Sequence, residues 1–529
     1  MKIAYAQMKI TPGHPDINTK KILQLIEEAK AGGADVVIFP AYAIQGELLG
    51  NTWDQRSFRN DCERCEREII AASKGIAVIF ECMDESLAKD FIIALDEEII
   101  DDEAADFSYK VKYGTDGKNC FGGADFYIKY HIGIKTAYGC PMIRVLGVGI
   151  CNNGKKIFVH DGGSAVFNSK GEVVQYAEPF TECLNFIELD EIDKMSALEV
   201  PEVSEAEKNY RTISYGVKEF LAQIGMKKVV IGVSGGIDSA VAAALYTQVF
   251  GAENVFLVNM PGVFNSATTK NLSEQLAKNL GCKYYVVPIQ ESVDWTVKQL
   301  EERGIKVSNF VKENIQARDR SSRILAAIAA AVGGGFTCNA NKAESTVGYA
   351  TLYGDAAGFL SALADLWKYQ VYDLARYMNE KIYKREVIPQ GIIDIVPSAE
   401  LSTAQNVDEG KGDPLKYPYH DYLFRAFVER NQTPEEILTW YANGELEKNI
   451  GCEIGLVEKY FPTAQEFIDD LERWWKQFTG MGVAKRIQTP PIISLKQISG
   501  SDEYPSYEAQ NGWHFTKNYL ELKNKLLAR

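Results

Sequence analysis

The sequence predicts an α/β protein made of two domains. Apolar segments typical of strands alternate with segments of helical spacing in both halves of the chain, and 529 residues exceed what a single hydrophobic core holds. An acidic stretch without periodicity, residues 189–209, separates the two halves. We therefore expect an α/β domain over residues 1–190, a linker over 191–208, a second α/β domain over 209–500 and a C-terminal tail over 501–529.

The first domain begins with a strand and a helix. Residues 1–10, MKIAYAQMKI, alternate as a strand does, and residues 18–33 have helical spacing and end on two glycines. Residues 34–40, ADVVIFP, predict a buried strand that Pro40 stops. Residues 155–177, KKIFVHDGGSAVFNSKGEVVQYA, predict strands joined by polar turns that close the domain.

The second domain alternates strands and helices more regularly. Strands are predicted around residues 228–233, 254–261 and 283–289, with helices after the first two. This order predicts a parallel sheet covered by helices, in which ligands bind at the carboxyl ends of the strands.

Composition excludes several classes of protein. Hydrophobic residues make up 46% and charged residues 24% of the chain, as in ordinary globular proteins. The net charge of −15 argues against a nucleic-acid partner, which would require a basic face. No apolar run reaches the roughly 18 residues of a membrane span, and residues 1–16 do not form a signal peptide, so we expect a cytoplasmic protein with no membrane partner.

Cysteine and histidine spacing does not indicate zinc. The ten cysteines are scattered, which favours reduced thiols, and the C-x-x-C pair Cys62 and Cys65 has no second pair or nearby histidine. The five histidines are not arranged as metal ligands along the sequence.

A glycine turn, SGGIDS, joins the strand at 228–233 to an alanine-rich helix. Glycines let the backbone approach phosphate oxygens, and unpaired N–H groups at the start of a helix attract anions. Asp238 within this turn would repel phosphate unless Mg²⁺ lies between them, so the turn predicts a Mg-pyrophosphate site. The structural alternative is a serine-capped helix after a tight turn.

Further polar residues follow downstream. Glu344 could complete the metal site with Asp238, and Lys368 could neutralise a transferring phosphoryl group. Alternatively, Glu344 caps a helix and Lys368 is a solvated helix residue.

The ordered motifs SGGIDSA, ENIQARDR, NANKAESTVGYATLYGDAAG, DLWKYQVYDLAR, PSAEL and KRIQTPP resemble those of the NAD synthetases, which are N-type ATP pyrophosphatases. The resemblance covers roughly residues 205–495 and implies a Rossmann-like parallel-sheet domain. It also implies that ATP adenylates the nicotinate carboxylate of deamido-NAD, and that ammonia then displaces AMP to give NAD. Converting a carboxylate into a mixed anhydride supplies the leaving group that the carboxylate lacks.

The resemblance assigns roles residue by residue. It implies that Asp238 and Glu344 hold Mg²⁺ and that Lys368 and Ser398 contact the ATP phosphates, with Asp238, Lys368 and Ser398 as the catalytic set. The other expected ATP-binding residues are Ser234, Gly235, Gly236, Ser239, Met260, Ser266 and Asn339. The expected deamido-NAD-binding residues are Arg318, Asp355 and Lys485. Asn339 and Ala340 stand where the family usually has threonine and glycine, so we expect altered ATP contacts.

The start and end of the first domain resemble a nitrilase-like glutaminase domain, an α/β sandwich that is shortened here. That chemistry uses a cysteine nucleophile, a glutamate base and a lysine. The glutamate normally follows the F-P pair, but Ala41 occupies its place in VVIFPAYAIQGE. We therefore expect a degenerate domain, and an enzyme that takes free ammonia or ammonia from a separate protein.

The residues leave alternatives open. Cys151 could be a rebuilt nucleophile with a relocated Glu47, giving a glutamine-dependent NAD synthetase, and Cys120 with Lys110 or Lys112 are other stand-ins. Another amide-forming ATP pyrophosphatase, a thiol hydrolase and a non-catalytic nucleotide sensor are further hypotheses. The resemblance also implies a homo-oligomer, at least a dimer.

Overall fold

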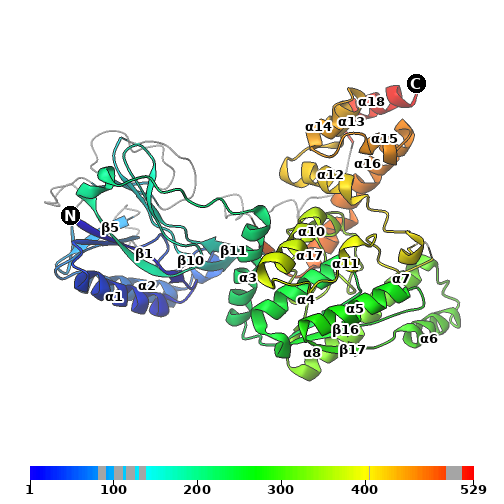
Figure 1. Cartoon of the computed structure of the whole chain (residues 1–529), viewed down its shortest axis with the longest axis horizontal. Helices are drawn as coiled ribbons and strands as arrows, with labels where there is room; N and C mark the ends of the chain where they lie inside the picture. The colour runs from blue at the N-terminus through cyan, green and yellow to red at the C-terminus, as the bar shows by residue number, and fades with distance from the viewer. Residues whose placement is uncertain are drawn as a thin grey trace. The chain divides into compact units, whose positions relative to one another are not determined.

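The computed structural model describes residues 1–81, 91–100, 111–114, 126–129, 139–403, 405–495 and 515–528. The chain folds as two compact units, coloured along the chain in Figure 1. The front unit comprises Met1–Asn153 and Ile157–Val203, and the second unit comprises Ser204–Arg529 with Gly154–Lys156. Both units combine sheets with helices, which confirms the predicted α/β class. Of the alternative nucleophile groups, Cys120 and Lys110 lie outside the described residues.

The front unit contains two larger sheets. In the first, β1, β3 and β4 are parallel and β14, β5 and β6 extend the sheet in the order β14-β1-β3-β4-β5-β6. The second has the order β13-β12-β9-β8-β7. The strands of the two sheets are β1 Lys2–Gln7, β3 Val36–Ile38, β4 Ala77–Glu81, β5 Phe91–Leu95, β6 Glu98–Ile100, β7 Val111–Gly114, β8 Phe126–Lys129, β9 Met142–Arg144, β12 Ala165–Phe167, β13 Val173–Tyr176 and β14 Cys183–Glu188.

Alternation along the strands builds a core on each face of the first sheet. Helices α1 (Pro15–Ala31) and α2 (Arg56–Ala71) cover one face, as Figure 1 shows. Ala4 and Ala6 of β1 point toward these helices, whereas Ile3 and Tyr5 pack with residues of the second sheet. The unit is therefore a layered α/β sandwich. Cys62 and Cys65 are buried in the helix-facing core.

Three strands of a further, four-stranded sheet lie in the front part of the sequence. Strand β10 (Val148–Asn152) pairs antiparallel with β11 (Lys156–Asp161) and parallel with β2 (Lys9–Ile10).

The second unit is built on a parallel sheet of order β17-β16-β15-β18. Its strands are β15 Val229–Gly232, β16 Val255–Asn259, β17 Lys283–Val286 and β18 Gly335–Phe336. Buried Val230 and Val258 pack on Ile289, Val293 and Leu325. The order of strands and helices confirms the parallel sheet that the sequence predicts.

Helices surround this sheet and continue beyond it. They are α3 Glu205–Gln223, α4 Ile237–Phe250, α5 Ala267–Leu280, α6 Gln290–Glu301, α7 Asn309–Arg318, η5 Asp319–Leu325, α8 Ala326–Val332, α9 Lys342–Val347, α10 Lys368–Tyr377, α11 Gln390–Asp394, α12 Tyr417–Glu429, α13 Pro434–Ala442, α14 Leu446–Ile450, α15 Leu456–Tyr460, α16 Ala464–Thr479, α17 Met481–Gln488 and α18 Lys517–Leu527.

The last helices form an aromatic core of their own. Phe424, Phe467 and Trp474 are buried there, and Tyr519 of α18 is fully buried among them. The hydroxyl of Tyr519 lies 3.1 Å from Oε1 of Glu472, to which it donates a hydrogen bond. The region expected as a tail therefore contains a packed helix.

Among the described helices, none combines the length and the apolar character needed to span a membrane.

Candidate functional site

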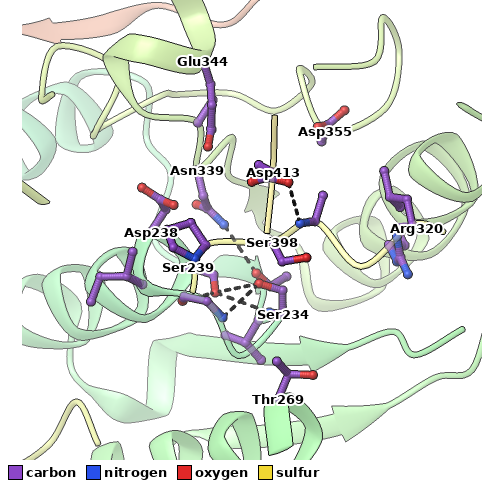
Figure 2. Close-up of a pocket in the computed structure, with 18 of the residues that line it drawn as sticks. Ser234, Asp238, Ser239, Thr269, Arg320, Asn339, Glu344, Asp355, Ser398 and Asp413 are labelled. Atoms are coloured by element: carbon purple, nitrogen blue, oxygen red, sulfur yellow. Dashed lines mark hydrogen bonds between the residues drawn. The ribbon is translucent and has the colours of Figure 1, made fainter. Parts of the chain in front are cut away.

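A cavity of about 270 Å³ lies at the carboxyl ends of β15 and β16. Gly232 at the end of β15 and Asn259 at the end of β16 line it, together with the turn that opens α4 and with loops from later in the chain. Figure 2 shows side chains from these segments pointing into one space. This is where a doubly wound parallel sheet binds its ligands.

The glycine turn forms one wall of this cavity. Gly236 precedes α4, and its N–H donates to the hydroxyl of Ser234 over 3.2 Å, while the hydroxyl of Ser239 donates to the Gly236 carbonyl over 3.0 Å. Gly235 has φ of +88°, and a Cβ there would lie 2.3 Å from the carbonyl oxygen of Thr269. Only glycine fits this position, so the turn holds two hydroxyls at the start of a helix, where anions are stabilised.

Two carboxylates and one ammonium group meet on another wall. Nζ of Lys368 lies 2.5 Å from Oδ2 of Asp238 and 3.9 Å from Oε1 of Glu344. The side chains of these three residues are 4%, 17% and 18% exposed, respectively. Burial and the charge of Asp238 raise the pKa of Glu344, whereas the Lys368 ammonium opposes that rise. Although burial alone would lower the pKa of Lys368, Asp238 and Glu344 raise it, so this residue is a buried cation and not a solvated one.

Neighbouring groups fix the orientation of these carboxylates. Asn341 caps α9 by accepting a hydrogen bond from the Glu344 N–H, and its amide also donates to Oδ1 of Asp238 over 3.2 Å. The hydroxyl of Tyr417 donates to Oε1 of Glu344 over 2.9 Å. Glu344 therefore caps its helix and also lines the cavity, so the two sequence interpretations of this residue are compatible.

The donor set of this wall fits Mg²⁺. Asp238 and Glu344 both direct an oxygen toward the same cation, the Lys368 ammonium, and oxygen is the ligand that Mg²⁺ prefers. These two residues would hold the ion, with phosphate oxygens and water as its other ligands.

Arg320 supplies a positive charge across the cavity from Asp238, as Figure 2 shows. Its Nε donates to the Met260 carbonyl and its Nη2 donates to Oδ1 of Asn265, each over 3.1 Å. Burial lowers the pKa of Arg320 to about 10, so the group stays charged at neutral pH. Lys368 and Arg320 thus provide two cations around the space that the glycine turn closes.

Most of the expected site residues line this cavity. They are Ser234, Gly236, Asp238, Ser239, Met260, Asn339, Glu344, Asp355, Lys368 and Ser398. Asn339 accepts a hydrogen bond from the hydroxyl of Thr337 over 2.8 Å, and its amide nitrogen donates to the Gly232 carbonyl over 3.4 Å. Ser398 donates to the Gln405 carbonyl over 3.2 Å.

Four expected residues lie outside the lining. Gly235 is packed against Thr269, and Ser266 caps α5 and binds Glu400. Arg318 is exposed and donates to the Leu352 carbonyl over 3.1 Å, and Lys485 donates to the Gly348 carbonyl over 2.7 Å.

The lining also contains polar and charged residues that were not expected, among them Arg320, Thr269 and Asp413. Arg320 is two residues from Arg318 in the motif ENIQARDR, so the motif contained the signal, although it did not indicate which arginine faces the cavity. Asp413 accepts the Ala399 N–H over 3.0 Å and fixes the loop that carries Ser398. No local pattern marks Asp413 or Thr269, because their roles depend on contacts distant in sequence.

The front unit has a second cluster of reactive groups. Sγ of Cys151 lies 3.1 Å from Nε2 of His160, and Oε2 of Glu47 lies 3.5 Å from the same nitrogen. Burial and then the charge of Glu47 raise the pKa of the Cys151 thiol. Burial lowers the pKa of His160 to about 4, so the imidazole is neutral at neutral pH and can accept a proton. Ala41 instead packs against the sheet core and carries no acid-base group.

Strand register brings the first two groups together. Cys151 is opposite Phe158 and His160 is opposite Gly149, so Cys151 and His160 are diagonal neighbours on one face of the β10–β11 pair. A Cβ at Gly149, which has φ of +140°, would lie 2.7 Å from the carbonyl oxygen of Ile10, so this position of β10 requires glycine.

Glu47 reaches this face from the loop after β3, and that loop is fixed. Gln45 donates to Glu81 over 3.1 Å, and the Gly46 N–H donates to the Tyr42 carbonyl over 2.8 Å. Gly46 has φ of +79°, and a Cβ there would lie 2.4 Å from Cα of Pro12. The tight packing of this glycine defines where the next residue, Glu47, is held.

Comparisons with known proteins agree with the geometry of the second unit. Residues 209–451 match the family described as NAD synthase. A glutamine-dependent NAD(+) synthetase of Synechocystis sp. is 33% identical over 330 residues, which cover 61% of this chain and 56% of that protein. One of Xylella fastidiosa is 27% identical over 508 residues, covering 84% of this chain and 92% of that protein. The alignments with the first two relatives span just over half of their length, 56% and 55%.

Two solved structures share the fold over most of the chain. The glutamine-dependent NAD(+) synthetase of Cytophaga hutchinsonii has a TM-score of 0.74 at 14% identity and covers 99% of both chains. That of Acinetobacter baumannii, in complex with ADP, has a TM-score of 0.64 at 21% identity and covers 85% of this chain and 91% of its own. These likenesses confirm the predicted α/β fold of both parts of the chain.

The comparisons correct the expectation that the enzyme uses only ammonia. The relatives are named glutamine-dependent NAD(+) synthetases, including one that aligns along most of the front unit. The expectation drawn from Ala41 was wrong, and the alternative of a rebuilt nucleophile Cys151 with a relocated Glu47 fits the relatives better. A carboxylate six residues later, Glu47, reaches a cysteine and a histidine in space. Residues 209–451 therefore match the NAD synthase family, and the chain is similar to the glutamine-dependent NAD(+) synthetases.

Proposed function

We propose that this protein is a glutamine-dependent NAD synthetase that converts deamido-NAD to NAD at the expense of ATP. The observation that carries the proposal is the cavity at the carboxyl ends of β15 and β16. There the glycine turn, two carboxylates and two cations surround one space, within the residues that match NAD synthase. This proposal is the alternative named in the sequence analysis, in which the front unit releases ammonia from glutamine.

The first step is adenylation of the nicotinate carboxylate. The carboxylate oxygen attacks the α-phosphorus of ATP, and the bond to the bridging oxygen of pyrophosphate breaks. Ser234, Ser239 and the start of α4 bind the pyrophosphate, and Lys368 exchanges Asp238 for a phosphate oxygen as charge develops. Bound at Asp238 and Glu344, Mg²⁺ would neutralise phosphate charge.

In the second step, the nitrogen of ammonia attacks the carbonyl carbon of the acyl adenylate, AMP leaves and a proton is released. Arg320, on the other side of the cavity, is positioned to pair with the departing phosphate. We retain the proposal that Asp355 and Lys485 bind deamido-NAD. We also retain the proposal that the protein is a homo-oligomer.

The front unit releases the ammonia in this proposal. Sγ of Cys151 attacks the side-chain amide carbon of glutamine while Nε2 of His160, 3.1 Å away, accepts the thiol proton. The imidazolium returns that proton to the leaving nitrogen, and water then hydrolyses the thioester to glutamate. Glu47, 3.5 Å from Nε2, stabilises the positive charge of the imidazolium.

The test is NAD formation from deamido-NAD, ATP and Mg²⁺ with either glutamine or ammonium chloride as the nitrogen source. We expect product from both sources in the wild-type protein. The variant Cys151→Ser should lose glutamine-supported synthesis and retain ammonium-supported synthesis, because the synthetase cavity is intact. Cys183→Ser, a substitution at a different thiol of the front unit that is partly buried, is the control and should retain both activities.

Failure with both nitrogen sources would refute the synthetase assignment. Glutamine-supported synthesis that survives Cys151→Ser at the wild-type rate would refute the nucleophile and leave the synthetase assignment standing.

A further inference from the structure

The cluster of Cys151, His160 and Glu47 in the front unit differs in geometry from a catalytic proton relay. In a proton relay of cysteine, histidine and carboxylate, the thiol and the carboxylate contact opposite nitrogens of the imidazole ring. Here Sγ of Cys151 and Oε2 of Glu47 approach the same nitrogen, Nε2 of His160, at 3.1 and 3.5 Å. All three donor atoms lie within 4.8 Å of one another. A sulfur, a nitrogen and an oxygen atom, each able to bind a metal ion, therefore lie close together.

This convergence matches the dimensions of a zinc site. Zinc binds sulfur at about 2.3 Å, imidazole nitrogen at about 2.0–2.1 Å and carboxylate oxygen at about 2.0–2.2 Å, with tetrahedral angles. Donor atoms around such an ion are therefore separated by about 3.3–3.6 Å. The Oε2–Nε2 separation of 3.5 Å lies within this range, and the Sγ–Nε2 separation of 3.1 Å is a few tenths of an ångström shorter, which side-chain rotation can absorb.

The position of each ligand in the fold supports the same conclusion. Cys151 and His160 are held on neighbouring strands, and Glu47 follows the constrained Gly46. Cys151 is 2% exposed, whereas the side chains of His160 and Glu47 are 34% and 23% exposed, so an ion can enter from their side. Thiolate, imidazole and carboxylate together form a mixed donor set that selects a borderline ion over Mg²⁺ or Ca²⁺.

We propose that Cys151, His160 and Glu47 bind a zinc-class divalent ion, and that the bound ion stops the use of glutamine. Binding replaces the thiol proton: Zn²⁺ forms a bond to sulfur and the proton leaves to solvent, with no change of oxidation state. The metal-bound sulfur cannot attack glutamine, and His160 no longer has a lone pair to accept a proton. The synthetase cavity is a separate site, so synthesis from ammonium continues.

The binding part of this proposal is independent of the proposed function, whereas the inhibition part rests on it. Co²⁺ is the probe for binding to the full-length metal-free protein, because a cobalt–thiolate bond gives a charge-transfer absorption that other ligands do not. We expect one equivalent of Co²⁺ to produce this band and Zn²⁺ to displace it. Cys151→Ser should abolish the band, and Glu47→Gln, which preserves shape, should weaken affinity at least tenfold.

Cys62→Ser is the matched control, because Cys62 and Cys65 form a separate buried thiol pair on α2. This variant should titrate as the wild type does. A band that persists in Cys151→Ser, or no band in the wild type, overturns the metal site.

The inhibition is measured with saturating Zn²⁺ and the two nitrogen sources. We expect glutamine-supported NAD formation to fall at least tenfold, ammonium-supported formation to change less than twofold, and a chelator to restore the lost rate. If the rate of glutamine-supported NAD formation is unchanged when the site is saturated with zinc, the proposed inhibition is refuted. Absence of synthesis from ammonium without zinc instead refutes the proposed function and leaves the cobalt titration valid.

Discussion

Replacement of Lys368 by methionine removes the buried cation at the centre of the synthetase cavity while keeping a side chain of similar length. In the ligand-free protein its ammonium group contacts Asp238 at 2.5 Å and Glu344 at 3.9 Å, with only 4% of the side chain exposed. Water therefore cannot replace the charge when a phosphoryl group is transferred. We expect the rate of NAD synthesis to fall by about 10²–10³-fold, or about 2.7–4 kcal/mol of transition-state stabilisation.

The assay for this variant uses ammonium as the nitrogen source, so that the front unit does not limit the rate. Lys278→Met is the matched control, because the Lys278 side chain is 72% exposed on α5, where it pairs with Glu274. The thermal midpoint of each variant is measured first, and rates are compared well below it. A rate for Lys368→Met within threefold of the wild type would refute the role of this cation in phosphoryl transfer.

Three further outcomes follow from the second unit. Glu344→Gln keeps the helix-capping carbonyl, so we expect a folded protein whose Mg²⁺ requirement rises at least tenfold. An unchanged Mg²⁺ dependence of the rate would exclude Glu344 as a ligand. Gly235→Ala places Cβ 2.3 Å from a backbone oxygen, so the Michaelis constant for ATP should rise at least tenfold. The control Gly281→Ala, which has positive φ but open space, should leave that constant unchanged. Burial alone would raise the pKa of Glu429, but the Lys342 ammonium lowers it to about 2. The substitution Glu429→Gln should therefore destabilise the second unit by about 3 kcal/mol at pH 7. Because the pKa of Glu429 is lower in the folded protein, that stabilisation is present above pH ~4.5 and is lost as pH falls toward 2. Urea unfolding of the wild type and of Glu429→Gln at pH 7 and pH 3 checks this, because the difference in their free energies of unfolding should be smaller at pH 3.

The sequence by itself determined the features that depend on local backbone and periodicity. The parallel sheet of the second unit and the glycine turn after β15 were predicted from short segments. A strand, a turn with positive φ and a helix are each specified by neighbouring residues. The ordered motifs added the resemblance to NAD synthetases, and residues 209–451 match that family.

Only the tertiary structure decided which side chains meet. Lys368 reaches Asp238 across 130 positions of the chain. Arg320 lines the cavity and Arg318 does not, because residues two apart on a helix point to nearly opposite sides. Cys151, His160 and Glu47 come from two strands and a loop, so no spacing in the sequence connects them. Ala41 could indicate the loss of one base, but it could not exclude a carboxylate brought to the same thiol by folding. Proximity between distant segments depends on the packing of the whole domain, and a local sequence pattern does not contain it.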